Sequence, residues 1–196
     1  MQGMGAQPTE GMVLMRVRLR EKHSDEALQQ IYAKPHQHLA WHDHRLRVAA
    51  TIELAKWAGV DAQSAADLSA GDAKIIEALD IPNKYIGDFA SGYEYTGAIE
   101  ETIEQIPNVD LFICSETIEH LDEPDRVLGQ IRGKAGTLIL STPIDEQGTG
   151  NAEHYWGWGV EDVRAMLTEA GWTPSVTQII NFNGNYDYDY QLWMCR

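Results

Sequence analysis

The stretch VDLFICSETIEHLDEPDRVLGQIRGKAGTLILSTP, residues 109–143, predicts a strand, a helix and a second strand in succession. Residues 109–114 are apolar almost throughout and residues 137–141 read TLILS, which is typical of strands buried on both faces. Pro124 is expected in the first turn of the helix, where its missing N–H costs nothing. Continuous apolar strands joined by a helix indicate a parallel sheet with helices on both sides.

Strands and helices alternate in the same way along most of the chain. Strands are expected at residues 64–68, 84–86 and within 93–99, and helices at 72–79, 100–105 and 160–170. Two last strands, 175–182 and 188–195, follow one another across the turn-rich NGNYD and predict an antiparallel hairpin. The expected fold is a Rossmann-like α/β three-layer sandwich around a mostly parallel seven-stranded sheet, with helices at the N-terminus. In such sheets ligands bind at the carboxyl ends of the strands.

The chain divides into three expected segments. Residues 1–11 are expected to be a disordered tail, residues 12–60 a helical lid or cap, and residues 61–196 the ligand-binding domain. Ser24 is a good N-cap for the first helix of the lid. A second helix over residues 43–58 is expected to bury one apolar side, formed by Leu46, Ala49, Ala50, Ile52, Leu54 and Trp57.

Charge is distributed unevenly along the chain, whose formal net charge is −15. Residues 11–47 hold seven Lys/Arg and four Asp/Glu, whereas residues 48–196 hold eight Lys/Arg and twenty-five Asp/Glu. An acidic body repels phosphate backbones, which argues against nucleic acid as the main partner. No apolar run approaches the ~20 residues that span a membrane. Cys114 and Cys195 lie in apolar strands and are expected to be buried thiols of a cytoplasmic protein.

The stretch SAADLSAGDAKII, residues 64–76, predicts a strand, a turn and a helix with the outline of a nucleotide-binding loop. That loop, D-x-G-x-G-x-G, needs its glycines because a pyrophosphate must approach the backbone closely. Asp67 and Gly71 keep their places here, but Ser69 and Ala73 replace the first and third glycines. The stretch therefore fits either an ordinary strand–turn–helix or a loop for a cofactor that has no phosphate to hold.

Asp88 follows directly after KYIG, twenty-one residues beyond Asp67. A ribose-binding acid is expected ~20 residues beyond such a loop, at the end of the next strand. A carboxylate at this position can accept hydrogen bonds from both hydroxyl groups of a ribose. The ordinary alternative is a turn or helix cap, a common role for an aspartate after a strand.

Residues 109–143 also carry a more specific pattern, namely a hydrophobic strand, a small residue, an acid, EHL-x-x-P, a helix and a strand that ends in STP. This succession resembles the class I SAM-dependent methyltransferases of the small-molecule type, in residues Cys114, Ser115, Glu116, Glu119, His120, Leu121, Pro124, Ser141, Thr142 and Pro143. The later NAEHYWGWGVEDVRAMLTEAGW, residues 151–172, is similar to the same family. The resemblance covers residues 48–196 and implies S-adenosyl-L-methionine (SAM) as the cofactor.

SAM has no phosphate, and its amino-acid end needs a close turn and a carboxylate for its ammonium group. The resemblance implies that Asp67, Ser69 and Gly71 hold this end of the cofactor. It further implies that Asp88 binds the ribose and that Phe89 contacts the adenine face.

The resemblance also assigns the remaining cofactor contacts. Ile99 would donate a backbone N–H to the adenine, with Glu100 as the acid for its exocyclic amine. The family usually has its acid one position earlier than Ile99, where this chain has Ala98. Ser115 and Glu116 would line the sulfonium end of the cofactor.

His120 and His154 are the only histidines of residues 48–196, and each follows a glutamate. An imidazole pKa of ~6.5 suits a general base for an oxygen acceptor. Both are therefore candidate catalytic residues, with a packing role as the alternative. Trp41, Tyr155 and Trp156 are candidates for the binding of the acceptor.

His36, His38, His42 and His44 form a dense cluster in the expected lid. Histidine clusters can bind zinc, but no nearby cysteine completes a tetrahedral set, and no metal is expected here. The cluster fits either a lid that meets the acceptor or a solvated surface.

The expected function is the SAM-dependent transfer of a methyl group to a small-molecule acceptor, such as a sugar or another hydroxyl compound. Two alternatives stay open. One is a Rossmann-like NAD(P)-dependent oxidoreductase, which the missing glycines disfavour, and the other is a non-catalytic SAM-binding domain. The identity of the acceptor and the oligomeric state are not determined by these patterns.

Overall fold

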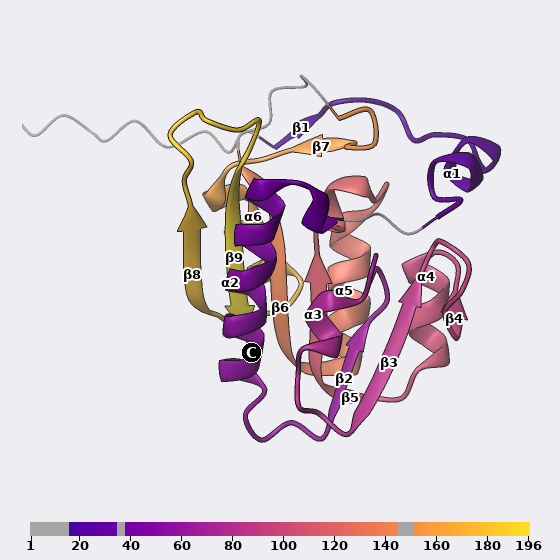
Figure 1. Cartoon of the computed structure of the whole chain (residues 1–196), viewed down its shortest axis with the longest axis vertical. Helices are drawn as coiled ribbons and strands as arrows, with labels where there is room; N and C mark the ends of the chain where they lie inside the picture. Colours follow the sequence, from indigo (N-terminus) through magenta and orange to yellow (C-terminus); the bar gives the residue numbers. More distant parts are fainter. Residues whose placement is uncertain (1–15, 35–37, 145–150) are drawn as a thin grey trace, which may run out of the picture.

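The computed structural model describes residues 16–34, 38–144 and 151–196, so the expected tail lies outside it. Its centre is a seven-stranded sheet in the order β4–β3–β2–β5–β6–β9–β8 (Figure 1). The strands are β2 (Ser64–Asp67), β3 (Asn83–Asp88), β4 (Tyr95–Thr96), β5 (Val109–Ser115), β6 (Ala135–Ile144), β8 (Pro174–Ile180) and β9 (Asp189–Cys195). Neighbours from β4 to β6 pair in parallel, whereas β9 is antiparallel to both β6 and β8. The predicted Rossmann-like sheet with its C-terminal hairpin is confirmed.

Helices cover both faces of this sheet because its central strands are apolar on both. One layer holds α2 (His42–Ala58) and α3 (Lys74–Glu77), and the other holds α4 (Ile99–Thr102), α5 (Pro124–Lys134) and α6 (Val160–Glu169). In β5, Leu111 and Ile113 pack with the α2 layer, while Phe112 and Cys114 pack with the α5 layer. This alternation is the two-residue period of a strand. Short 3-10 turns add η1 (His38–Ala40), η2 (Ile103–Gln105) and η3 (Ile118–His120).

The helix α2 forms one layer of the sandwich rather than part of a lid over it. Its buried residues are Asp43, Arg47, Val48, Thr51, Leu54 and Ala55. The predicted apolar side is right for Leu54, but wrong for Leu46 and Trp57, which are 44% and 61% exposed. Polar side chains occupy buried positions four residues apart on this helix, which conceals its inward face from a hydrophobic pattern. The expected domain boundary between residues 60 and 61 would place α2 in a different segment from the sheet against which it packs.

Residues 16–34 are the described part of the expected lid that remains outside the sandwich (Figure 1). There β1 (Val17–Arg18) pairs antiparallel with β7 (Trp156–Gly157), in a small second sheet that the sequence did not predict. The helix α1 (Asp25–Ile31) begins after Ser24, whose side chain accepts a hydrogen bond from an N–H of the first turn, as predicted. No residue of α1 is buried, so its apolar side chains remain available to line a cavity.

Both cysteines are free and buried, as predicted. Burial raises the pKa of both thiols, and that of Cys195 to about 12, so the two side chains pack as apolar groups. Among the described helices, none has both the length and the apolar composition that crossing a membrane would require.

Gly87 allows β3 and β4 to approach closely. A Cβ at this position would lie 2.5 Å from the Tyr95 carbonyl oxygen and 2.9 Å from the Tyr95 Cβ. We predict that Gly87→Ala displaces β4 and lowers the free energy of unfolding by about 1–3 kcal/mol, measured by urea denaturation.

A matched control is Gly129→Ala in α5, where an added Cβ meets nothing within 4 Å. Alanine is the better helix former, so this variant should gain up to about 1 kcal/mol. Equal effects of the two substitutions would contradict the steric explanation for Gly87.

Candidate functional site

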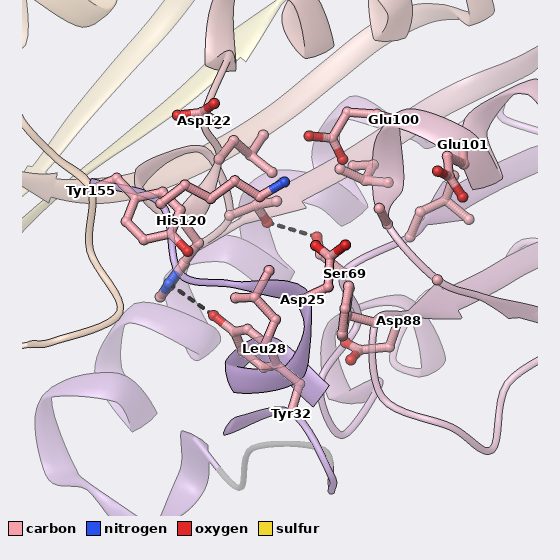
Figure 2. Close-up of a pocket in the computed structure, with 18 of the residues that line it drawn as sticks. Asp25, Leu28, Tyr32, Ser69, Asp88, Glu100, Glu101, His120, Asp122 and Tyr155 are labelled. Carbon is pink, nitrogen blue, oxygen red and sulfur yellow. Dashed lines mark hydrogen bonds between the residues drawn. The ribbon is translucent and has the colours of Figure 1, made fainter. Parts of the chain in front are cut away.

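A cavity of about 510 Å³ opens where β2, β3 and β5 end, and α1 closes one side of it (Figure 2). We call it the first cavity. The carboxyl ends of parallel strands meet at one edge of a sheet, which brings residues distant in the sequence to this place. Of the residues predicted from sequence, those that line it are Ser69, Gly71, Asp88, Phe89, Ile99, Glu100, Glu116, His120 and Tyr155.

The loop after β2 turns sharply at two positions. Gly71 has φ 56° and Ala73 has φ 58°, both in the left-handed region, and the expected helix 72–79 is therefore shortened to α3. Ser69 is not in that region, so its backbone does not need a glycine. The Ser69 hydroxyl lies 2.6 Å from the Thr117 hydroxyl, which joins the loops after β2 and β5.

Asp88 occupies the predicted position at the end of β3. One carboxylate oxygen accepts the Gly71 N–H at 2.8 Å, and the other accepts the Ala90 N–H at 2.8 Å. Asp88 thus holds the glycine turn of the neighbouring strand in place. A carboxylate has about four acceptor sites, so it can serve the backbone and a ligand hydroxyl together.

Asp67 lies beneath the loop and is only 2% exposed, and it is not among the residues that line the cavity. Its Oδ1 accepts the Ser69 N–H at 3.3 Å. Burial raises the pKa of Asp67 to about 8, against the opposing effect of the Ser69 hydrogen bond and with a further increase from Asp88. Its visible role is therefore to support the loop rather than to face a ligand.

The wall opposite the loop is formed by residues after β3 and at the start of α4. Ile99 and Glu100 line the cavity, as does Ala98 at the position where the resembled family has an acid. Phe89 also lines it, with its ring centroid 5.6 Å from that of Tyr32. This part of the cavity thus combines apolar side chains with the acidic edge of α4.

A second cavity, of about 570 Å³, shares Glu116 and His120 with the first. Its other walls come from the start of α2, the segment before β7 and the turn between β8 and β9. They include Trp41, Asp43, His44, Asn151, Glu153, His154, Tyr186, Asp187 and Tyr188. Ligands in the two cavities would meet at Glu116 and His120.

Arg47 of α2 is 1% exposed and lies at the centre of a buried polar network. Its Nη1 donates to the hydroxyls of Ser115 and Ser141, its Nη2 lies 3.2 Å from Nδ1 of His44, and its Nε lies 3.8 Å from the Glu116 carboxylate. Glu116 has φ 53° and accepts the Ser141 hydroxyl at 3.1 Å. Burial raises the pKa of Glu116, and Arg47 opposes this increase.

The two predicted catalytic histidines lie together at the boundary of the cavities. The ring centroids of His120 and His154 are 4.7 Å apart, and the rings are close to perpendicular. Nδ1 of His120 lies 3.1 Å from the Glu153 carbonyl oxygen and 3.2 Å from the Tyr32 hydroxyl. Nε2 of His154 lies 3.0 Å from the side-chain amide of Asn151.

Asp67, Ser115 and Trp156 were predicted as ligand contacts but line neither of these two cavities. The Ser115 hydroxyl binds the buried guanidinium instead. The Trp156 indole N–H donates to the Leu121 carbonyl at 2.9 Å, and the Arg16 guanidinium lies 4.2 Å from the ring centroid. Each of these three side chains therefore has a hydrogen-bond partner within the protein.

The histidine-rich segment is only partly described. His36 and the side chain of His38 lie outside the described residues. His42 is exposed and contacts Arg45, whereas Nε2 of His44 lies 3.3 Å from the Tyr190 hydroxyl.

Sequence reasoning assigned no role to Arg47, Tyr32, Thr117 and Thr142. A signal existed for Arg47, because Asp43, Arg47 and Thr51 follow one another at four-residue spacing and share one helix face. Three polar residues on one stripe of a helix that also carries many apolar residues indicate a buried polar network.

No protein-family model and no curated protein sequence matches the chain. The N-methyltransferase NodS from Bradyrhizobium japonicum WM9, in complex with S-adenosyl-l-homocysteine (SAH), matches with a TM-score of 0.66 and 16% identity, over 87% of this chain and 96% of that chain. The 1,6-didemethyltoxoflavin-N1-methyltransferase from Burkholderia thailandensis, with bound 1,6-didemethyltoxoflavin and SAH, matches with a TM-score of 0.60 and 15% identity, over 97% of this chain and 99% of that chain. The [4+2]-cyclase SpnF matches with a TM-score of 0.63 and 11% identity, over 78% of this chain and 81% of that chain. The chain therefore has the fold of class I methyltransferases, which a cyclase also shares.

Removal of the Arg47 charge would leave Glu116 buried without its cation. We predict that Arg47→Met lowers the free energy of unfolding by about 3–5 kcal/mol, and that a second change, Glu116→Gln, recovers at least about 1 kcal/mol. Urea denaturation of the two single variants and the double variant measures this coupling. Lys56→Met, at the exposed end of the same helix, should change stability by less than about 0.5 kcal/mol. Additive losses would contradict a direct interaction between Arg47 and Glu116.

The raised pKa of Asp67 predicts that the stability of the folded protein depends on pH. Its pKa is about 8 in the folded protein and ~3.9 in an unfolded chain, so the folded state holds the proton more tightly. The contribution of this proton to the free energy of unfolding is complete below pH ~4. It decreases by up to about 1.4 kcal/mol for each pH unit as the pH rises to about 8. Asp67→Asn should therefore become progressively more stable than the wild type between pH 4 and 8. A constant difference in thermal denaturation across this range would refute the raised pKa.

Proposed function

We propose that this chain is a class I SAM-dependent methyltransferase that acts on a small-molecule acceptor. The observation that carries the proposal is the convergence of separately predicted residues on one cavity, namely the loop after β2, Asp88, the start of α4 and Glu116. Ordinary turn and cap roles would not require these residues to share a cavity. The likeness in fold to two SAH-bound methyltransferases supports the same function. The two free thiols are consistent with a cytoplasmic enzyme.

The residues of the first cavity fit SAM. The left-handed turn at Gly71 and the short side chain of Ser69 let a ligand approach the backbone. Asp88 would accept the ribose hydroxyls, and Phe89 and Ile99 would contact the adenine. SAM supplies a methyl group that its positively charged sulfonium sulfur activates for transfer.

We propose that the acceptor binds in the second cavity, because this cavity meets the first at Glu116 and His120. Rings of Trp41, Tyr186 and Tyr188 offer flat apolar surfaces, and nearby acids can accept hydrogen bonds. A sugar or another hydroxyl compound matches this combination. Nucleic acid does not, because the chain has a net charge of −15.

The protein's own contribution would be orientation and the exclusion of water, since methyl transfer requires an in-line approach of the acceptor. Residues at the edge of the lid, such as Leu28 and Tyr32, cover the first cavity from the side of α1 (Figure 2). For an oxygen acceptor, His154 and His120 are the candidate bases, and Tyr155 lines the first cavity nearby.

Titration calorimetry of the purified chain with SAH, SAM and NADH tests the cofactor. We predict binding of SAH and SAM, and a loss of at least about tenfold in affinity for Asp88→Ala and Asp88→Asn, because hydrogen bonds to a charged group are removed. Asp72→Ala is the matched control, since this acid of the same loop does not line the cavity and should bind SAH normally.

Each result separates the candidate functions. Absence of SAH and SAM binding would overturn the proposal, and NADH binding in its place would favour the oxidoreductase. Transfer of a radioactive methyl group from SAM to pools of small hydroxyl compounds then separates an enzyme from a non-catalytic SAM-binding domain. Unchanged SAH affinity in both Asp88 variants would exclude Asp88 from the site.

A further inference from the structure

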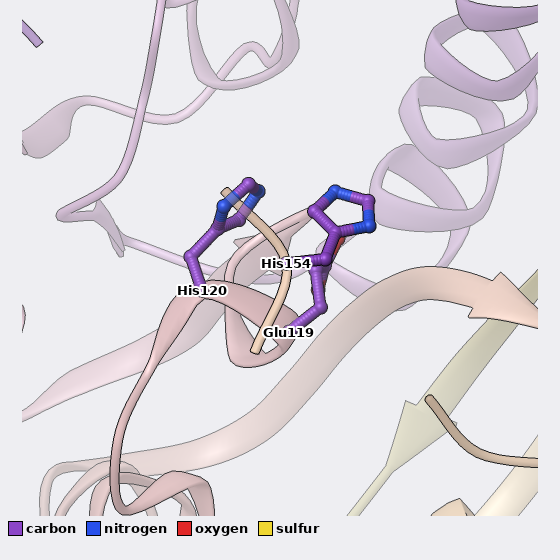
Figure 3. A group of neighbouring side chains, drawn as sticks. All are labelled: Glu119, His120 and His154. Carbon is purple, nitrogen blue, oxygen red and sulfur yellow. The ribbon is translucent and has the colours of Figure 1, made fainter. Parts of the chain in front are cut away.

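The side chains of Glu119, His120 and His154 lie next to one another (Figure 3). His120 lines both cavities and His154 lines the second, whereas Glu119 is buried behind them and lines neither. Each side chain offers one ligand atom, and these atoms all lie within 4.8 Å of one another. The sequence had suggested no metal at this place. We propose that the three side chains form a binding site for one divalent first-row transition-metal ion.

The three ligand atoms lie near enough for a small rearrangement to bring them onto one ion. Ligand atoms at ~2.0–2.2 Å from a tetrahedral metal lie about 3.3–3.6 Å apart, so the widest separation in the cluster would have to shorten by roughly 1–1.5 Å. Glu119 and His120 are neighbours on η3, whereas His154 comes from the segment before β7. Two imidazoles and one carboxylate suit zinc, iron or cobalt better than magnesium, which prefers oxygen ligands alone.

A buried oxygen of Glu119 points to a bound cation independently of the distances within the cluster. Glu119 is 0% exposed, and its Oε1 has no hydrogen-bond partner within residues 16–34, 38–144 and 151–196, while its Oε2 accepts the Thr142 hydroxyl at 3.0 Å. A buried acceptor without a partner is costly, and a cation would compensate it. A carboxyl with only a structural role would be expected to satisfy both of its oxygens.

The surroundings of the cluster resemble the outer hydrogen bonds that orient metal ligands. The Trp158 indole N–H donates to Thr142 at 3.0 Å, and Thr142 in turn holds the Glu119 carboxylate. Nδ1 of His120 lies 3.1 Å from a backbone carbonyl oxygen, which is an outer partner of the kind that fixes an imidazole on a metal. Nε2 of His154 lies 3.0 Å from the side-chain amide nitrogen of Asn151, which positions this ring.

The location implies a role for the ion, and this part rests on the proposed function. His120 lines both cavities and His154 lines the second, so the ion would stand between the cofactor and the acceptor. A metal with three protein ligands has room for one or two oxygens of an acceptor and lowers the pKa of a bound hydroxyl. The favoured acceptor then carries two adjacent oxygens, such as a vicinal diol. A histidine that binds the ion cannot also act as the base.

Metal binding by the metal-free, full-length chain tests the site without cofactor or acceptor. Titration calorimetry with Zn²⁺ and visible spectroscopy with Co²⁺ should show one ion per chain. We predict that Glu119→Gln and His154→Gln each weaken Zn²⁺ binding by at least about 100-fold, since even outer-shell changes cost 10–100-fold. Glu119→Gln retains the size of the side chain and its Thr142 contact, and circular dichroism checks that both variants fold.

His42→Gln is the matched control, because His42 belongs to the exposed histidine-rich segment and not to the cluster. It should change Zn²⁺ affinity by less than about twofold. Failure to bind one ion per chain, or an equal loss in His42→Gln and His154→Gln, would overturn the metal site. SAH titration of the same samples keeps the two proposals apart: SAH binding without metal binding refutes only the metal site, whereas metal binding without SAH binding refutes only the proposed function.

Discussion

The buried guanidinium of Arg47 is the constraint on which the site depends. A charge removed from water must find opposite charge and hydrogen bonds nearby, or the fold loses several kcal/mol. Arg47 finds them at the ends of β5 and β6, in Ser115, Ser141 and Glu116. This requirement ties α2 to the carboxyl edge of the sheet, beside Glu116, which has a left-handed backbone conformation and lines both cavities.

The rest of the edge is organised by similar cross-links between neighbouring loops. Asp88 holds the turn at Gly71, and Ser69 bonds to Thr117, so the loops after β2, β3 and β5 form one connected wall. On the other side, Tyr32 at the end of α1 contacts His120 and links this helix to the same wall. A ligand in the first cavity would therefore meet groups whose positions are already set by the protein, which reduces the ordering that binding requires.

The sequence allowed much of this fold to be predicted, because apolar strands and helix caps are local signals. Strands β5 and β6 and the final hairpin were found within a few residues of their ends. The inward face of α2 was assigned only in part, since Asp43, Arg47 and Thr51 are buried on it while Leu46 and Trp57 are exposed. The pairing of β1 with β7 was missed, because two strands of two residues each carry almost no pattern.

The residues of the candidate site also include some that the sequence predicted and some that it did not. Ser69, Gly71, Asp88 and Glu116 could be predicted because motif spacing locates a residue after a strand, and parallel strands then bring such residues together. The sequence by itself determined the class of fold and the edge of the sheet at which the first cavity opens. Only the tertiary structure decided that Asp67 lies beneath the loop, that Arg47 is buried, and that Glu119, His120 and His154 converge. Burial and mutual distance depend on how separate segments pack, and no local pattern encodes that packing.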